Sequence, residues 1–150
     1  MLSSGGRRWY GHEDELERAM TYEQAWYELH LKLGHTQRTC AYCGRRLVRS
    51  RLQGLTAWGH GHHVLVVESR AKGEQQKIAL LSSLNIVLAC PVCHVPPKRD
   101  FVYRCSLYLL EKYGPVALED WVEGLPLENR WLPRYYWEAK ETWLESTTPR

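Results

Sequence analysis

Four of the five cysteines in this 150-residue chain form two Cys-x-x-Cys pairs, Cys40 with Cys43 and Cys90 with Cys93. With two residues between them, both sulfurs of a pair can face one metal ion. Two such pairs in one small chain are typical of a tetrahedral site with four thiolate ligands. We therefore predict a structural zinc ion, which would join two segments of the chain that have 46 residues between them.

Two other uses of the paired cysteines stay open. A Cys-x-x-Cys pair also occurs in redox proteins, and cysteines can simply be buried thiols. Disulfides are less expected, because the N-terminus lacks the apolar core of a secretion signal. We therefore expect a cytoplasmic protein whose thiols are reduced. The fifth cysteine, Cys105, falls in a helical pattern and is predicted to be a core thiol.

The composition, 44% hydrophobic and 25% charged, is that of a globular protein rather than a disordered chain or a coiled-coil rod. No apolar run approaches the roughly 18 residues that a membrane span requires, so we expect no membrane partner. The spacing of apolar residues predicts an α+β fold, with helices over about 13–20, 21–33, 101–113, 116–123 and 133–144. The second of these helices should begin with a capping box at Thr21 and end at Gly34.

The segment between the cysteine pairs is more extended. Residues 47–55 are predicted to form a strand and turn, and residues 58–68 a strand rich in β-branched side chains. A polar loop is expected over 69–76, followed by a short apolar run over 84–88.

The net charge of +3 decides little, but its distribution is uneven. Residues 36–78 carry eight basic and two acidic side chains, a net charge of +6, whereas residues 1–35 carry a net charge of −2 and residues 114–150 one of −3. Such a cationic block would attract a polyanion with salt-sensitive affinity. A solvated, arginine-rich loop would have the same composition, so charge alone leaves both interpretations open.

Three of the seven histidines fall within four residues, in the run Gly59-His60-Gly61-His62-His63-Val64. A strand alternates its faces, so His60 and His62 should share one side and His63 the other. Further along the chain, Asn85 precedes the second cysteine pair and His94 directly follows it.

This order of motifs resembles the HNH endonucleases. The shared pattern is a cysteine knuckle, a His-His pair entering a strand, a polar loop, an asparagine before an apolar run, and then Cys-x-x-Cys-His. It covers about residues 39–98, with 22 residues from His63 to Asn85 and nine from Asn85 to His94. The resemblance implies a zinc-stabilised ββα-metal (His-Me finger) core over 39–113. Helical extensions would then occupy residues 1–38 and 114–150.

The resemblance also implies a role for each polar residue of the motif. His62 and His94 would hold a catalytic divalent metal ion, and His63 would be the general base that activates water. Asn85 would orient His63, either directly or by fixing the loop backbone; it could also be a simple turn residue. The catalytic ion would be Mg²⁺ or Mn²⁺, and two imidazole ligands would also suit Ni²⁺ or Zn²⁺.

Three features depart from the family pattern. The stretch Val64-Leu65-Val66-Val67 stands where many members have a proline, and the usual Gly-Gly of the loop is reduced to Gly73. The Pro96-Pro97 pair replaces the more usual helix-starting residues and could re-aim His94.

The expected function is therefore metal-dependent hydrolysis of DNA phosphodiester bonds, by nicking or double-strand cleavage. A zinc-stabilised nucleic-acid-binding adaptor without catalysis and a structure-selective nuclease for branched DNA are the alternatives. DNA is the expected partner, and a homodimer or a larger phage or mobile-element complex is compatible with the family, in which case the protein would act in the host cytoplasm. Candidate DNA phosphate contacts are Arg45, Arg46, Arg49, Arg51, His60, Arg70 and Lys72.

Overall fold

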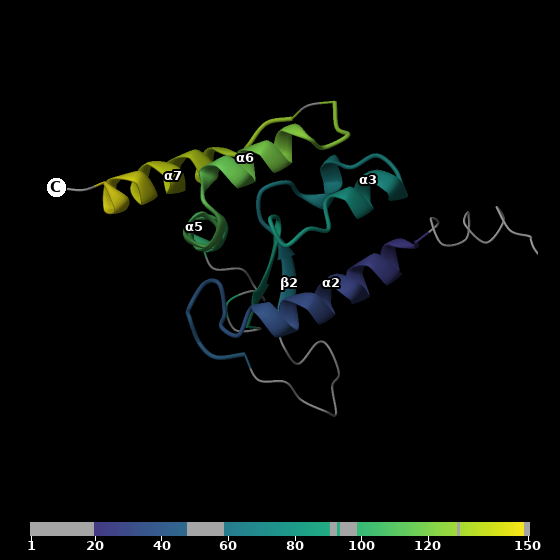
Figure 1. The fold of residues 1–150 in the computed structure, drawn as a ribbon, viewed down its shortest axis with the longest axis horizontal. Helices are drawn as coiled ribbons and strands as arrows, with labels where there is room; N and C mark the ends of the chain where they lie inside the picture. Colours follow the sequence, from purple (N-terminus) through teal and green to yellow (C-terminus); the bar gives the residue numbers. More distant parts are fainter. Residues whose placement is uncertain (1–19, 48–58, 91–92, 94–98, 129, 149–150) are drawn as a thin grey trace, which may run out of the picture.

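The computed structural model describes residues 20–47, 59–90, 93, 99–128 and 130–148, and its fold is drawn in Figure 1. In chain order the elements are α2 (Tyr22–Thr36), β2 (His60–His63), η2 (Glu68–Arg70), α3 (Glu74–Ala79), β3 (Ile86–Ala89), α5 (Phe101–Tyr113), α6 (Pro115–Glu123) and α7 (Arg134–Thr147). Helices thus combine with a small two-stranded sheet, which confirms the predicted α+β class. The predictions for residues 13–19 and for most of 47–55 lie outside the described residues.

The sheet pairs β2 with β3 in antiparallel fashion, from His60 opposite Ala89 to His63 opposite Ile86. The predicted strand over 58–68 is wrong in length, since β2 ends at His63. Beyond that point, the amides of Leu65 and Val66 donate to the side chain of Asn85 rather than to a strand. One asparagine side chain therefore turns the chain away from the sheet despite the β-branched residues.

Helix α2 begins with the predicted capping box, in which Thr21 and Gln24 each accept a hydrogen bond from the other's backbone amide. The predicted end at Gly34 is wrong, because the helix continues to Thr36. Gly34 does not adopt the left-handed conformation that ends helices, whereas Gly44, Gly59, Gly73 and Gly114 have positive φ.

The predicted polar loop over 69–76 is also only partly correct. Residues 68–70 form the short η2 turn, and α3 begins at Glu74. Gly73, at φ 85°, makes the sharp entry into α3, and the Gln76 side chain accepts a hydrogen bond of 2.7 Å from the Lys72 amide. Local side-chain bonding therefore folds a polar stretch that has little apolar periodicity.

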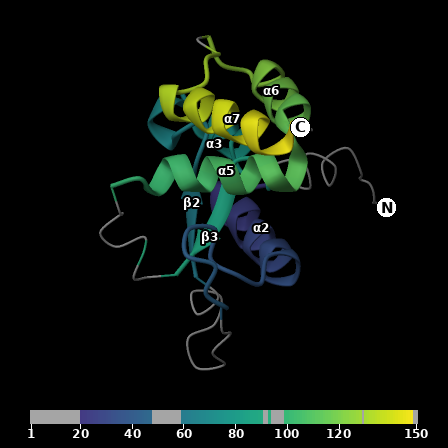
Figure 2. The ribbon, with the colours of Figure 1, turned by 90° about the vertical axis from the view of Figure 1, so that its left-hand side faces the viewer.

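The three C-terminal helices follow the predicted pattern, with Pro115 in the first turn of α6. In two perpendicular views, the sheet lies between α2 and α5, and α6 and α7 stack beyond α5 (Figures 1 and 2). Leu118 and Tyr136 of the C-terminal helices share one buried cluster with Cys40 and Cys90. The cysteine segments and the C-terminal helices are therefore built on a common core.

A second, smaller cluster joins α2 to the other side of β3. Leu29 and Leu33 of α2 are buried with Ile86 and Leu88 of β3. Of the helices in the described ranges, none combines the length and the apolar character needed to cross a membrane.

Candidate functional site

The four paired cysteines come together in the structure. The sulfur atoms of Cys40, Cys43, Cys90 and Cys93 all lie within 4.8 Å of one another, with 3.7 Å between those of Cys43 and Cys90 and 3.4 Å between those of Cys90 and Cys93. A tetrahedral zinc ion with Zn–S bonds of about 2.3 Å separates its sulfurs by about 3.8 Å. The cluster therefore fits a metal ion such as zinc.

Backbone amides point at these sulfurs. Cys40 Sγ accepts from the amides of Tyr42, Cys43 and Cys90 at 3.3–3.5 Å. Burial of Cys90 opposes ionisation, but hydrogen bonds with Cys93 and with the other two cysteines outweigh it and lower the pKa of Cys90 to about 7, whereas burial and the same contacts raise the pKa of Cys93. The amide donors to Cys40 and the lowered pKa of Cys90 favour the thiolate form that binds metals.

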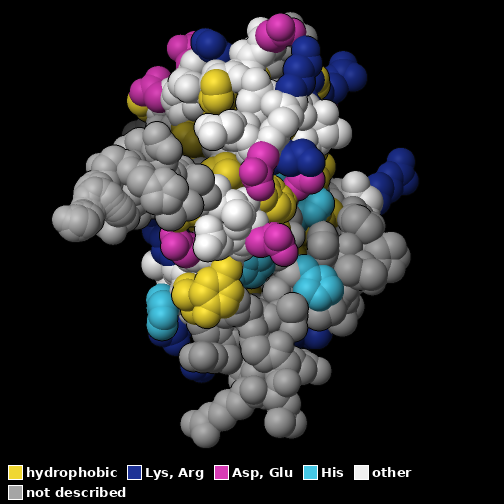
Figure 3. All heavy atoms as spheres, turned by 90° about the vertical axis from the view of Figure 1, so that its right-hand side faces the viewer, with side chains coloured by type: hydrophobic (Ala, Val, Ile, Leu, Met, Phe, Trp, Pro, Cys, Tyr) yellow, Lys and Arg dark blue, Asp and Glu magenta, His cyan; other side chains and the backbone are white. Residues whose placement is uncertain are grey.

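His62 and His63 face opposite sides of the sheet, as strand alternation predicts. The His62 ring lies edge-on to Phe101, in the first turn of α5, with 4.7 Å between ring centroids. The His63 ring lies 5.8 Å from Trp26 of α2. The two neighbouring imidazoles are thus directed toward different helices. Figure 3 shows histidine side chains exposed on the lower half of one face of the molecule.

Gly61 allows α2 to approach β2 closely. A Cβ atom at this position would lie 3.0 Å from the Trp26 ring and 3.1 Å from the His30 ring. His30 Nδ1 lies 2.9 Å from the Trp26 carbonyl, and because a carbonyl only accepts, Nδ1 carries the hydrogen. Sequence reasoning missed Trp26 as a neighbour of His63 and His30 as a neighbour of Gly61. The signal was a glycine inside a strand, which often marks a close approach.

The environment of His63 favours the neutral ring. Burial lowers the pKa of His63, while the negative charge of Glu68 acts in the opposite direction. Glu68 in turn accepts a hydrogen bond from the Tyr22 hydroxyl on α2. Within the described part of the chain, His63 Nε2 is buried and has no hydrogen-bond partner. A neutral imidazole with a free ring nitrogen has the protonation state that a general base needs.

Asn85 holds the backbone that follows His63. Its Oδ1 accepts from the amides of Leu65 and Val66 at 2.8 and 2.9 Å, and its Nδ2 donates to the carbonyls of Val66 and Leu80. Its own carbonyl accepts from the Val64 amide at 2.8 Å. These partners are all backbone groups, so the side chain fixes the loop backbone, which fits both the indirect orienting role and a simple turn residue.

Several predicted residues lie outside the described ranges, namely His94, Arg49, Arg51, Pro96 and Pro97. Two other predicted cations are exposed beside the first cysteine pair. Arg45 donates its amide to Cys43 Sγ at 3.4 Å, and Arg46 forms an isolated bridge with Thr39.

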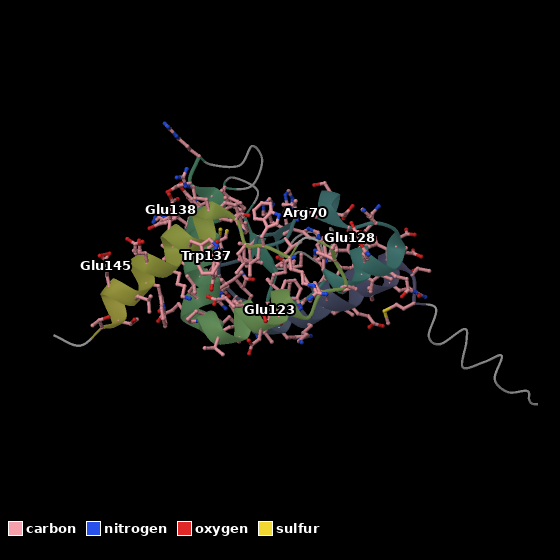
Figure 4. All side chains as sticks on the ribbon, turned by 90° about the horizontal axis from the view of Figure 1, so that it is seen from above. Arg70, Glu123, Glu128, Trp137, Glu138 and Glu145 are labelled. Carbon is pink, nitrogen blue, oxygen red and sulfur yellow. The ribbon has the colours of Figure 1, made fainter. Side chains whose placement is uncertain are left out.

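The remaining basic candidates contact the C-terminal part of the chain. The Arg70 guanidinium carbon lies 4.4 Å from the centroid of the Trp131 ring, and Lys72 pairs with Glu128 at 3.2 Å. Figure 4 shows Arg70 and Glu128 close to each other when the molecule is seen from above. No local sequence pattern predicts these contacts. His60 is half-buried on β2, opposite Ala89.

Comparison with family models, with curated proteins and with solved structures found no match to this chain.

Proposed function

We propose that this chain is a metal-dependent DNA endonuclease of the HNH class. Its ββα-metal core would consist of β2, β3 and α5, the described helix that follows the second cysteine pair. The observation that carries the proposal is the position of the histidine strand. His60 pairs with Ala89, the residue before Cys90, so one hairpin joins the histidines to the four-cysteine cluster.

The orientation of His62 agrees with a ligand role. Its ring contacts Phe101, which opens the helix that follows the second cysteine pair. His94 belongs in sequence to the connection between that pair and the helix. The imidazoles of His62 and His94 could therefore bind the same ion. Bound there, a divalent ion would offset the negative charge that develops on the phosphate. Two nitrogen donors would suit Mn²⁺, Ni²⁺ or Zn²⁺ as well as Mg²⁺.

His63 is the proposed general base. Its neutral ring would take a proton from a water molecule as the water oxygen attacks phosphorus. The bond from phosphorus to the leaving oxygen breaks, and that oxygen then takes up a proton. Asn85 supports this role by holding the backbone beyond His63 with hydrogen bonds to Leu65 and Val66.

DNA is the proposed substrate because cationic charge is concentrated near the histidines in sequence. Arg45 and Arg46 are exposed next to the first cysteine pair, where they would contact phosphates. Phosphate contacts of this kind position a duplex without reading its sequence.

Nicking of supercoiled plasmid tests the proposal. The purified protein should convert plasmid to the nicked or linear form with Mg²⁺, Mn²⁺ or Ni²⁺, and chelator should stop the reaction. His63→Ala should lower the rate by roughly 10²- to 10⁴-fold while zinc content and circular dichroism stay unchanged. His35→Ala, at an exposed position in the last turn of α2, is the matched control and should cut at the parent rate. Cleavage by His63→Ala at the parent rate would exclude His63 as the base.

A nucleic-acid-binding adaptor is the second candidate. The burial of His63 Nε2 favours it, because a base must reach the attacking water. In that case the protein would retard plasmid in a gel without cutting it under any metal condition. A nuclease for branched DNA would leave the plasmid intact and cut a four-way junction run beside it.

A further inference from the structure

The peptide bond between Val64 and Leu65 is held from both sides. The Val64 carbonyl accepts a hydrogen bond from the hydroxyl of Tyr135, and the Leu65 amide donates to Asn85 Oδ1 at 2.8 Å. Val64 is fully buried, so its carbonyl has no access to water as an alternative partner. Tyr135 lies 71 residues further along the chain, in the first turn of α7.

Two further contacts join the same segments. Arg70 stacks on Trp131 at 4.4 Å, and Lys72 pairs with Glu128 at 3.2 Å. We call the three residues Glu128, Trp131 and Tyr135 the C-terminal anchor. It contacts the chain that follows His63 at three points between residues 64 and 72.

The three contacts are unequal in strength. The side chains of Lys72 and Glu128 are 75% and 78% exposed, and such surface ion pairs contribute little. The cation–π contact contributes more, although Trp131 is half exposed. The hydrogen bond from Tyr135 contributes most to holding the loop, because loss of the hydroxyl would leave the buried Val64 carbonyl without a donor.

The first turn of α7, which carries Tyr135, is held in place by contacts of its own. Its neighbour Tyr136 is fully buried and donates its own hydroxyl to Glu119 of α6 at 2.7 Å. Lys140 pairs with the same carboxylate at 2.7 Å. The first turn of α7 is therefore fixed independently of the loop that Tyr135 reaches.

We propose that Tyr135, assisted by Trp131, is a positioning residue for His63. Together with Asn85 it sets the orientation of the Val64–Leu65 peptide, and so the direction in which the chain leaves His63. This inference rests on the proposed nuclease function for its consequence in catalysis, but not for the anchoring of the loop. The C-terminal helices thus contribute to the site, although they contain none of its proposed catalytic groups.

Two tyrosine variants test the proposal. Tyr135→Phe removes the hydroxyl that reaches the loop, and Tyr136→Phe removes a hydroxyl from the next residue that bonds only to Glu119 among the described residues. Hydrogen exchange of the Leu65 and Val66 amides is measured in both, together with kcat and KM for plasmid nicking.

Tyr135→Phe should accelerate exchange at these amides and lower kcat by roughly ten- to a hundredfold with KM unchanged. Tyr136→Phe should leave both quantities unchanged even where it lowers the melting temperature. Equal losses of kcat in the two variants would indicate general loosening of α7 and overturn the proposal. Unchanged exchange in Tyr135→Phe would overturn it as well.

Exchange also separates this inference from the proposed function. Faster exchange in Tyr135→Phe, with a parent protein that cuts no DNA, would uphold the anchoring while the nuclease assignment fails. If Tyr135→Phe does not fold, Trp131→Leu at the exposed anchor position replaces it. That variant should accelerate exchange between residues 65 and 71, and unchanged exchange there would overturn the proposal.

Discussion

The side chain of Gln37 bonds to both backbone groups of Leu88. Its Nε2 donates to the Leu88 carbonyl at 2.7 Å, and its Oε1 accepts from the Leu88 amide at 2.8 Å. The amide side chain thus takes the place of a neighbouring strand beside β3. Gln37 also ends α2, where its own amide donates to Leu33 at 2.7 Å. One residue therefore connects the end of the N-terminal helix to the strand that leads into the second cysteine pair.

Replacement of Gln37 by methionine should destabilise the fold. The side chain keeps its length but leaves the buried Leu88 amide without an acceptor, so we expect a loss of about 2–3 kcal/mol in the free energy of unfolding. Gln75→Met, at an exposed position of α3, should change it by less than about 0.5 kcal/mol. Urea denaturation measures both. Equal effects in the two variants would show that the contact with Leu88 contributes nothing.

Gly61→Ala should disturb the contact between α2 and the histidine strand. The added methyl group would lie 3.0 Å from the Trp26 ring and 3.1 Å from the His30 ring, so these side chains must move aside, at a cost of about 1–3 kcal/mol. Gly124→Ala is the control, because its nearest neighbours would be 3.6 Å away and its φ of −83° suits any residue. Thermal unfolding compares the two, and tryptophan fluorescence should change only in Gly61→Ala. A Gly61→Ala protein as stable as the parent would contradict the close approach.

Retention of zinc through dialysis should depend on the cysteine cluster. The parent protein should hold one zinc ion per chain, and Cys93→Ala should lose it and unfold at a lower temperature, since metal binding contributes to folding. Cys105 is buried but lies outside the cluster, so Cys105→Ala should keep its zinc. Elemental analysis after dialysis measures the stoichiometry. Retention of zinc by Cys93→Ala, or its loss from Cys105→Ala, would refute the assignment.

Stability should fall in strong base partly through Tyr135. Burial raises the pKa of Tyr135 from 10.0 to about 12, and the nearby Cys105 adds to the effect. Between pH 10 and 12 the unfolded chain has released this proton while the folded protein retains it, so the free energy of unfolding decreases as the pH rises.

Urea midpoints at pH 9, 10 and 11 check this dependence. Tyr135→Phe should show a shallower decline than the parent, because the group that ionises on unfolding is gone. Tyr27→Phe, at an exposed position, should retain the full decline. A decline of the same steepness in Tyr135→Phe would show that burial does not perturb this tyrosine.

Sequence patterns predicted an element correctly where the interactions that form it are between residues close together in the chain. The capping box at Thr21 depends on residues three apart, and α2 begins there. The C-terminal helices follow from their apolar spacing. The end of α2 was missed because it depends on Gln37 and its distant partner Leu88. The end of β2 was missed because the side chain of Asn85, 22 residues after His63, accepts a hydrogen bond from the Leu65 amide that a longer strand would use for pairing.

The spacing of the cysteines determined from the sequence alone that four thiolates could meet, since two residues between ligands leave few other geometries. The adjacency of His62 and His63 in the sequence likewise determined that they would face opposite sides of a strand, because side chains alternate along a strand. The tertiary structure decided what each face meets. Trp26 approaches His63 only because Gly61 has no side chain, and Tyr135 reaches Val64 only because α7 packs on the core shared with the cysteines. Such contacts join residues far apart in the chain, and no local pattern records them.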